Sequence, residues 1–303
     1  MHLLSKARIY FYLLGGLLGI ACTFAPSTAS AIEIRVKLLE TNNSVSIGSS
    51  TDAVVRSTDE NLGTVDAGKS EMIALNGNSL SFHNQSTSTI YVEPSNAGLV
   101  WINGKWYRGR AEIVFNSSRT QVINYVELED YLYSVVGGEM DADWSPEALK
   151  AQAVAARTYA IHKMSESSHR NYDVFPSTQD QYYGGESKVT DTTVAAVDAT
   201  RGIVMTYQNQ PILAVYHACS GGYTKNVESV WGNYLSYLRG VQDFDDGYKE
   251  CPRGKGWGHG LGMSQYGAST LANRGWKWQE ILNYYYTNVS FDYSSNFIAD
   301  SEQ

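Results

Sequence analysis

Short segments in which hydrophobic and polar residues alternate fill the chain from Ile32 to about Val122. Alternation puts every second side chain on the same face of an extended chain, so these segments predict β-strands. The clearest are IEIRVKLL, DAVVRS, EMIAL, STIYVEP and GLVWINGKWYRGRAEIVF. In the last of them Asn103-Gly104 separates two alternating runs, which predicts a two-residue hairpin. Polar connectors such as TNNSVSIGSSTD are typical of surface loops.

A helical period replaces this alternation after Ser145. Ser145 is a good N-cap residue and Pro146 suits the first position of a helix. No Gly or Pro follows as far as Lys163, and small or apolar residues recur at spacings of three and four. This pattern predicts a long helix over about residues 146–164 with one narrow face that another backbone can approach closely. The residues on that face are Ala148, Ala151, Gln152, Ala155 and Tyr159.

A glycine-rich segment follows near the C-terminus. Residues 257–267, WGHGLGMSQYG, contain four glycines among eleven residues. Such density predicts a backbone that packs tightly or lies close to a ligand, with a second helix starting around Met263. The sequence therefore predicts an α+β protein. A β-rich part (32–121) precedes a mixed region (122–303) that holds the long helix and the glycine-rich loop.

The first 31 residues have the features of a secretory signal peptide. A basic start with Lys6 and Arg8 precedes an apolar run, and Ala29-Ser30-Ala31 is a typical cleavage site. The alternative is an uncleaved anchor, although the run is shorter than the about 20 residues that span a bilayer. Loss of residues 1–31 moves the net charge from −8 to −10. An acidic exported protein of this kind is not expected to bind nucleic acid.

Two cysteines remain after this cleavage. Cys22 leaves with the signal, whereas Cys219 and Cys251 form an even pair in an oxidising compartment, where a disulfide is expected. A catalytic thiol with His217 as its base, or a metal pair, are the alternatives. His217 and Cys219 are two residues apart and would share one face of a strand, which favours a bystander role for the histidine.

A lone glutamate stands in the stretch GGEMDADWSPEALKAQAVAARTYA (137–160). Glu139 is expected on a loop between Gly137-Gly138 and the start of the long helix. The two glycines are expected to leave space beside the carboxylate, and a loop on a rigid helix start is a common place for a functional group. Asp141 and Asp143 lie close behind, and we expect them to be solvated loop residues.

Three motifs in this region resemble the SpoIID/LytB family, whose bacterial members act on peptidoglycan. They are YVELEDYLYSVVGGEMDADWSPEALKAQAVAARTYA, AVYHACSGGYTKNVESVWG and WGHGLGMSQYGA, which occur in the family's order and cover most of residues 122–285. The resemblance implies a lytic transglycosylase that cuts glycan strands whose stem peptides have been removed. Some relatives are described as amidase enhancers, so a cell-wall amidase is a possible partner.

The resemblance places the family's catalytic glutamate, in the GEM position, at Glu139. Ordinary glycosidases use two carboxylates, one as acid and one as base or nucleophile. A lytic transglycosylase can use one, which protonates the leaving oxygen and then accepts the proton of the muramic C6 hydroxyl as a 1,6-anhydro ring closes. To act as an acid near neutral pH, Glu139 must have a pKa above the about 4.3 of a free glutamate.

The expected substrate contacts surround this group in the three motifs. They are Gly138, Gln152, Arg157, Ser220, His259, Ser264 and Gln265. For Gln152, a buried hydrogen bond is an equal alternative to a substrate contact. Aromatic residues of the loop after the helix are expected to stack on sugars or to pack in the core, and they are Tyr172, Phe175, Tyr182 and Tyr183.

The chain departs from the family at one point. Some relatives hold zinc with one His and two Cys in the loop after the long helix, whereas residues 169–185 keep His169 and contain no cysteine. We therefore expect no metal and no other cofactor. Two further functions stay open at this stage, a non-catalytic wall-binding module that stimulates an amidase and a cysteine-dependent amidase or peptidase.

Overall fold

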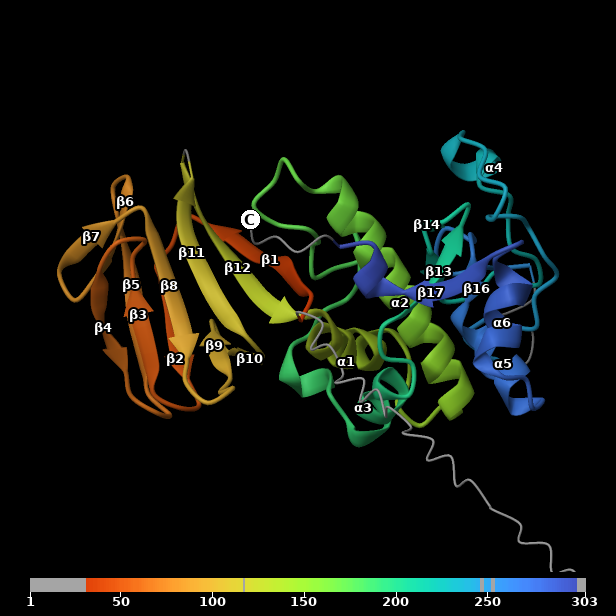
Figure 1. Ribbon diagram of the computed structural model, residues 1–303, viewed down its shortest axis with the longest axis horizontal. Helices are drawn as coiled ribbons and strands as arrows, with labels where there is room; N and C mark the ends of the chain where they lie inside the picture. The colour runs from red at the N-terminus through yellow and green to blue at the C-terminus, as the bar shows by residue number, and fades with distance from the viewer. Residues whose placement is uncertain (1–30, 117, 246–247, 252–253, 299–303) are drawn as a thin grey trace, which may run out of the picture. The chain divides into compact units, whose positions relative to one another are not determined.

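The computed structural model describes residues 31–116, 118–245, 248–251 and 254–298, so the expected signal peptide lies outside the described residues. Within these ranges, no helix is both long and apolar enough to cross a bilayer. Figure 1 shows strands β1–β12 in two layers, followed along the chain by helices and two small sheets. The protein is therefore of mixed α+β class, as the sequence predicted.

Each layer of the β-rich part is a six-stranded sheet. The first has the order β1-β12-β11-β8-β3-β4 and the second β10-β9-β2-β5-β6-β7. Alternate residues are buried in part of β1, in β3 and in β8, and they belong to the apolar core that both sheets share, namely Ile34, Val36, Ala53, Val55, Ile90 and Val92. The strands are β1 (Glu33–Thr41), β2 (Val45–Ser49), β3 (Ala53–Arg56), β4 (Asn61–Val65), β5 (Ser70–Asn76), β6 (Ser79–Phe82), β7 (Gln85–Thr87), β8 (Thr89–Pro94), β9 (Val100–Ile102), β10 (Lys105–Tyr107), β11 (Arg110–Asn116) and β12 (Arg119–Glu127).

The strand predictions are confirmed except at one connector. The hairpin at Asn103-Gly104 joins β9 to β10, and both residues have positive φ, 44° and 95°. The segment TNNSVSIGSSTD, expected to be a loop, instead contains β2, whose Val45 and Ile47 are buried. The expectation was wrong because β2 pairs with β5 on one side and with β9 on the other. With two paired neighbours, two apolar residues at alternate positions are enough to form a strand.

Helices dominate the rest of the chain. The long helix is confirmed as α2. The second helix is confirmed as α5, which starts two residues after Met263. The helices are α1 (Leu128–Glu139), α2 (Pro146–Glu166), η1 (Glu186–Lys188), α3 (Asp191–Asp198), α4 (Glu228–Trp231), α5 (Gln265–Asn273), α6 (Trp278–Tyr285) and η2 (Ser294–Asn296). The remaining strands are β13 (Ile203–Tyr207), β14 (Gln210–Pro211), β15 (Tyr216–His217), β16 (Met263–Ser264) and β17 (Ser290–Tyr293).

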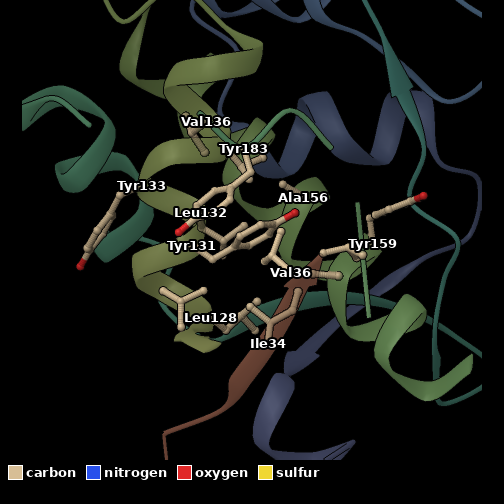
Figure 2. Close-up of a cluster of buried hydrophobic side chains, with 14 of the residues drawn as sticks. Ile34, Val36, Leu128, Tyr131, Leu132, Tyr133, Val136, Ala156, Tyr159 and Tyr183 are labelled. Atoms are coloured by element: carbon tan, nitrogen blue, oxygen red, sulfur yellow. The ribbon is translucent and has the colours of Figure 1, made fainter. Parts of the chain in front are cut away.

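The loop between α2 and η1 is anchored to the first strand. Arg35 of β1 pairs with Asp173 of the loop at 2.6 Å, and the Lys37 amide donates to the Val174 carbonyl at 3.0 Å. Figure 2 shows residues of β1, α1 and α2 meeting in one apolar cluster, with Tyr131 in its middle. These contacts fix residues 173–174, so the position of the loop is set before its later residue Tyr182 contacts Glu139.

The expected disulfide between Cys219 and Cys251 is present. Both cysteines are fully buried, and Cys219 also exchanges two backbone hydrogen bonds with Trp257 of the glycine-rich loop. The bridge closes a loop of 32 residues, which corresponds to about 3–4 kcal/mol of unfolded-state entropy. Neither sulfur is a free thiol in this state, which leaves the cysteine-dependent alternative without its nucleophile.

Candidate active site

Glu139 is the last residue of α1, and not a loop residue as expected. One carboxylate oxygen, Oε1, accepts a hydrogen bond of 2.7 Å from the backbone N–H of Tyr182. The other, Oε2, accepts one of 3.3 Å from the side-chain amide of Gln265, the first residue of α5. The carboxylate is therefore held between the end of one helix, the start of another and the anchored loop.

The surroundings of this carboxylate favour its protonated form. Burial raises the pKa of Glu139, and the hydrogen bonds from Tyr182 and Gln265 oppose that rise in pKa without cancelling it. Among the described residues no Lys, Arg or His is paired with Glu139. A half-buried carboxyl with two neutral donors and no cation is suited to donate a proton near neutral pH.

The glycines before Glu139 serve packing. A Cβ on Gly137 would lie 2.0 Å from the carbonyl oxygen of Lys188, and a Cβ on Gly138 would lie 2.5 Å from the Tyr182 ring. The expectation that these glycines leave space for a sugar was wrong, because loop residues fill that space. Gly138 acts by letting Tyr182 approach α1 closely enough to donate to the carboxylate.

Replacing Gly138 by Ala is expected to reduce both stability and activity. Alanine gains about 1 kcal/mol of helix propensity over glycine, whereas overpacking against Tyr182 costs about 1–3 kcal/mol. The net result is a lower melting temperature and a displaced Tyr182 N–H, which should slow cleavage of the expected glycan substrate. Thermal unfolding and product formation measure both effects. A variant that melts at or above the wild-type temperature would contradict this account of the glycine.

Ser264 is the N-cap of α5 and Gln265 is its first residue, and their side chains have different partners. Gln265, with 6% of its surface exposed, reaches Glu139 as described. Ser264 is fully buried, and its hydroxyl oxygen accepts the Gly267 N–H as the N-cap of the helix. Of these two expected substrate contacts, the structure therefore brings only Gln265 to the carboxylate, and we assign Ser264 to the helix cap.

The two polar residues of α2 lie inside the protein. The guanidinium of Arg157 forms an ion pair of 2.6 Å with Glu129 and also donates to the Ile203 carbonyl. Because Arg157 is fully buried and engaged, we assign it a structural role in place of the expected substrate contact. Gln152 is also fully buried, and neither atom of its amide has a hydrogen bond partner among the described residues.

Ser220 belongs to a clamped turn. Its hydroxyl donates to Asp243 at 2.7 Å, and its backbone N–H donates to Asp245 at 2.6 Å. The hydroxyl is therefore engaged within the protein, and this turn is held by carboxylates as well as by the neighbouring disulfide. Its role as a substrate contact stays a prediction.

His259 sits in an aromatic cluster. Its ring lies 5.3 Å from the Trp231 ring and 5.6 Å from the His217 ring, centroid to centroid, and its Nδ1 accepts the Leu261 N–H at 3.0 Å. Burial lowers the pKa of His259, so the ring is neutral near pH 7. Trp231 is 45% exposed, which makes its face available to a sugar ring. His259 contacts these two rings and bonds the backbone of Leu261 and Tyr216, and among the described residues it has no hydrogen bond with Glu139.

The loop aromatics divide between surface and core. Tyr182 is 38% exposed beside Glu139, whereas Tyr183 is buried against Tyr131. Asp141 and Asp143 are exposed, as expected for loop residues. No group of three or more His, Cys, Asp or Glu side chains is arranged to hold a metal ion within the described residues, which are 31–298 without 117, 246–247 and 252–253.

Three residues beside Glu139 were not anticipated. Gln181 is fully buried and bonds the hydroxyls of Tyr131 and Tyr216, and the negative charge of Glu139 contributes to the raised pKa of both tyrosines. Tyr216 stands in a motif quoted above, but nothing in its spacing marks it. Gln181 lies in a loop without periodicity, so no pattern could have indicated it.

A hollow in the described part of the chain lies away from Glu139. It has a volume of about 620 Å³ and is lined on its charged side by Arg108, Arg110 and several acids. Arg108 pairs with Asp130 and Glu186, and Arg110 pairs with Glu33. These ion pairs satisfy the charges within the protein, and Glu139 is not in the lining.

Comparisons with known proteins agree on one family. Residues 116–207 match the family model SpoIID, described as Stage II sporulation protein. Stage II sporulation protein D of Bacillus subtilis (strain 168) is 26% identical over 273 residues, covering 59% of this chain and 78% of that protein. The amidase enhancer of the same organism is 42% identical over 115 residues, 38% of this chain. Residues 116–207 of this chain belong to the SpoIID family.

The SpoIID match has clear limits along the chain. It contains α1, α2 and the loop with Gln181 and Tyr182, and it ends before Ser220, His259 and Gln265. The chain spans 15% of the length of the amidase enhancer. It spans 38% of an uncharacterised protein of Brachyspira hyodysenteriae, to which it is 38% identical over 141 residues. SpoIID membership therefore rests most directly on the segment that carries Glu139.

Proposed function

We propose that this protein is a lytic transglycosylase that cuts the bond between N-acetylmuramic acid and N-acetylglucosamine in peptide-free peptidoglycan strands. The observation that carries the proposal is the half-buried Glu139 carboxyl, whose pKa is raised by burial and which has two neutral hydrogen bond donors. Membership of the SpoIID family supports a role at the cell wall. We further propose that the protein is exported after cleavage of residues 1–31, with which the buried disulfide is consistent.

The single carboxyl performs both proton transfers. Protonated Glu139 gives its proton to the glycosidic oxygen as the bond from that oxygen to muramic C1 breaks. Positive charge then develops at C1, and the C6 hydroxyl of the same sugar attacks this carbon. The carboxylate accepts the hydroxyl proton, so a 1,6-anhydro ring forms and Glu139 regains its starting state. No water is consumed. Asp141 and Asp143 are exposed, which supports a mechanism without a second carboxylate.

The substrate itself is expected to bind through neutral groups. A peptide-free strand offers hydroxyls, amides and sugar faces, and the protein offers exposed rings at Tyr182 and Trp231. Aromatic faces and hydrogen bonds recognise such groups without a cation. This mode of binding suits a mature chain of acidic net charge.

The test uses the products. Peptide-free glycan strands are incubated with the mature protein and analysed by mass spectrometry, and 1,6-anhydromuramic ends are expected. Hydrated reducing ends would indicate a hydrolase. Binding without any cleavage would instead support the second candidate, a wall-binding enhancer of a partner amidase, which the similarity to a protein named amidase enhancer favours.

The pH dependence follows from the groups around Glu139. The rate should fall as pH rises through the raised pKa, because the acid then loses its proton. The Gln265 amide stabilises the ionised carboxylate and lowers this pKa, so Gln265→Met should raise the pKa and move the alkaline limb to higher pH. Rates of both proteins over a pH series measure the shift. A limb that stays in place, or moves to lower pH, would contradict this role of Gln265.

A further inference from the structure

Both the oxygen and the nitrogen of the Gln181 side-chain amide form hydrogen bonds inside the protein. It is fully buried, its Oε1 accepts the Tyr131 hydroxyl at 3.1 Å, and its Nε2 lies 2.9 Å from the Tyr216 hydroxyl oxygen. The same Nε2 lies 3.3 Å from the carbonyl oxygen of Ala156 in α2. In Figure 2 the Tyr131 hydroxyl points toward Ala156, in keeping with a single amide that reaches both.

The carbonyl of Ala156 fixes the direction of these bonds. A carbonyl oxygen can only accept, so the end of the amide that faces it must be the NH₂ group. The second N–H of that group then donates to the Tyr216 oxygen, and the oxygen end of the amide accepts from Tyr131. Tyr216 is thus an acceptor toward Gln181, and its own O–H proton has no acceptor among the described residues.

Tyr216 and Gln181 are both close neighbours of residues that bond Glu139. Tyr182, the residue after Gln181, donates its backbone N–H to Glu139. Tyr216 pairs with Met263 in the small sheet β15-β16, and Gln265, which also bonds Glu139, is two residues further. The charge of Glu139 is the largest cause after burial of the raised pKa of Tyr216, which agrees with this placement. The tyrosine remains neutral and keeps its proton at any working pH.

We propose that Gln181 is a positioning residue that holds Tyr216 so that its hydroxyl donates to an oxygen of the sugar bound at Glu139. The inference rests on the proposed function for the kind of ligand, a neutral N-acetylated sugar. The Tyr131–Gln181–Tyr216 chain leaves Tyr216 one free donor with a fixed direction. A donor oriented before binding loses less entropy when the ligand arrives.

A binding cycle tests this inference separately from catalysis. Peptide-free glycan strands are titrated calorimetrically into the Glu139→Gln protein, in which cleavage is expected to be about 10²–10⁴-fold slower. The same titration is made with this protein carrying Gln181→Met, Tyr216→Phe or both. Each single change should weaken binding about two- to tenfold, the value of one hydrogen bond. The double variant should bind no more weakly than Tyr216→Phe, because Gln181 acts through the hydroxyl that is already gone.

The controls separate positioning from folding. Tyr159→Phe removes another tyrosine hydroxyl, which bonds Asp180 at 2.7 Å next to Gln181, and it should leave affinity unchanged. If Gln181→Met does not fold, Gln181→Glu keeps the acceptor for Tyr131 and loses both N–H donors. Additive losses in the double variant, or unchanged affinity for Gln181→Met, would overturn the inference. The cleavage products of the wild-type protein decide the proposed function independently.

Discussion

Replacement of Glu139 by Gln is expected to lower the rate of glycan cleavage by about 10²–10⁴-fold, the usual contribution of a general acid and base. Glutamine has nearly the same shape and can still accept the Tyr182 N–H, so the site stays folded while the proton is lost. Formation of 1,6-anhydro ends measures the effect. Asp141→Asn removes an exposed carboxylate two residues away and serves as the matched control, with activity close to wild type.

The same variant has an expected effect on stability. The folded-state pKa of Glu139 is raised, so its contribution to stability is present below the unfolded pKa and is lost as pH rises through the folded pKa. Above that folded-state pKa the wild-type protein carries an ionised, half-buried carboxylate that the Glu139→Gln variant lacks. The melting temperature of Glu139→Gln relative to the wild-type protein should therefore increase as pH rises through the folded-state pKa of Glu139. A large loss of stability together with the loss of activity would remove the catalytic interpretation.

Replacement of Arg157 by Met is expected to destabilise the protein by about 3–5 kcal/mol, because it leaves Glu129 charged and buried without its partner. A second change, Glu129→Leu, should restore much of this loss, since it removes the unpaired charge. Denaturant unfolding of the two single variants and the double variant measures the coupling. This is the largest effect on stability that we expect from a single ion pair of the described residues.

An exposed ion pair provides the comparison. Arg110 pairs with Glu33 at 2.7 Å, and both side chains are about one third to one half exposed, at 33% and 44%. Arg110→Met should cost less than about 1 kcal/mol. If Arg157→Met cost no more than Arg110→Met, the structural role assigned to Arg157 would be wrong.

The spacing of hydrophobic residues predicted those strands and helices that bury one face in the core. It predicted β1, β3, β5, β8 and α2 because each presents one regular apolar pattern to the core. It missed α1, since Gly137-Gly138 near its end has low helix propensity and close packing compensates for it. The β2 strand was missed because its neighbours in the sheet, and not its own composition, make it a strand.

The site could be predicted only in part. Glu139 and Gln265 stand in recognisable motifs, and the structure brings them within 3.3 Å of each other. The second donor is the backbone N–H of Tyr182, which any residue would offer, so its position depends on the path of the loop. Arg157 and Ser264 occur in the same motifs as Glu139 and Gln265, yet they stabilise the interior. A motif therefore identified the region of the chain, whereas burial and hydrogen bonding separated the roles within it.

The place of Glu139 on its helix affects its chemistry through the backbone. The peptide dipoles of α1 add up to a partial negative charge at the C-terminal end, where Glu139 lies. This partial charge destabilises the ionised Glu139 carboxylate by about 0.3–1 kcal/mol and so favours the protonated carboxyl. The direction of α1 thus adds to the effect of burial on the pKa of Glu139, and the same glutamate at the opposite end of α1 would lose its proton more readily.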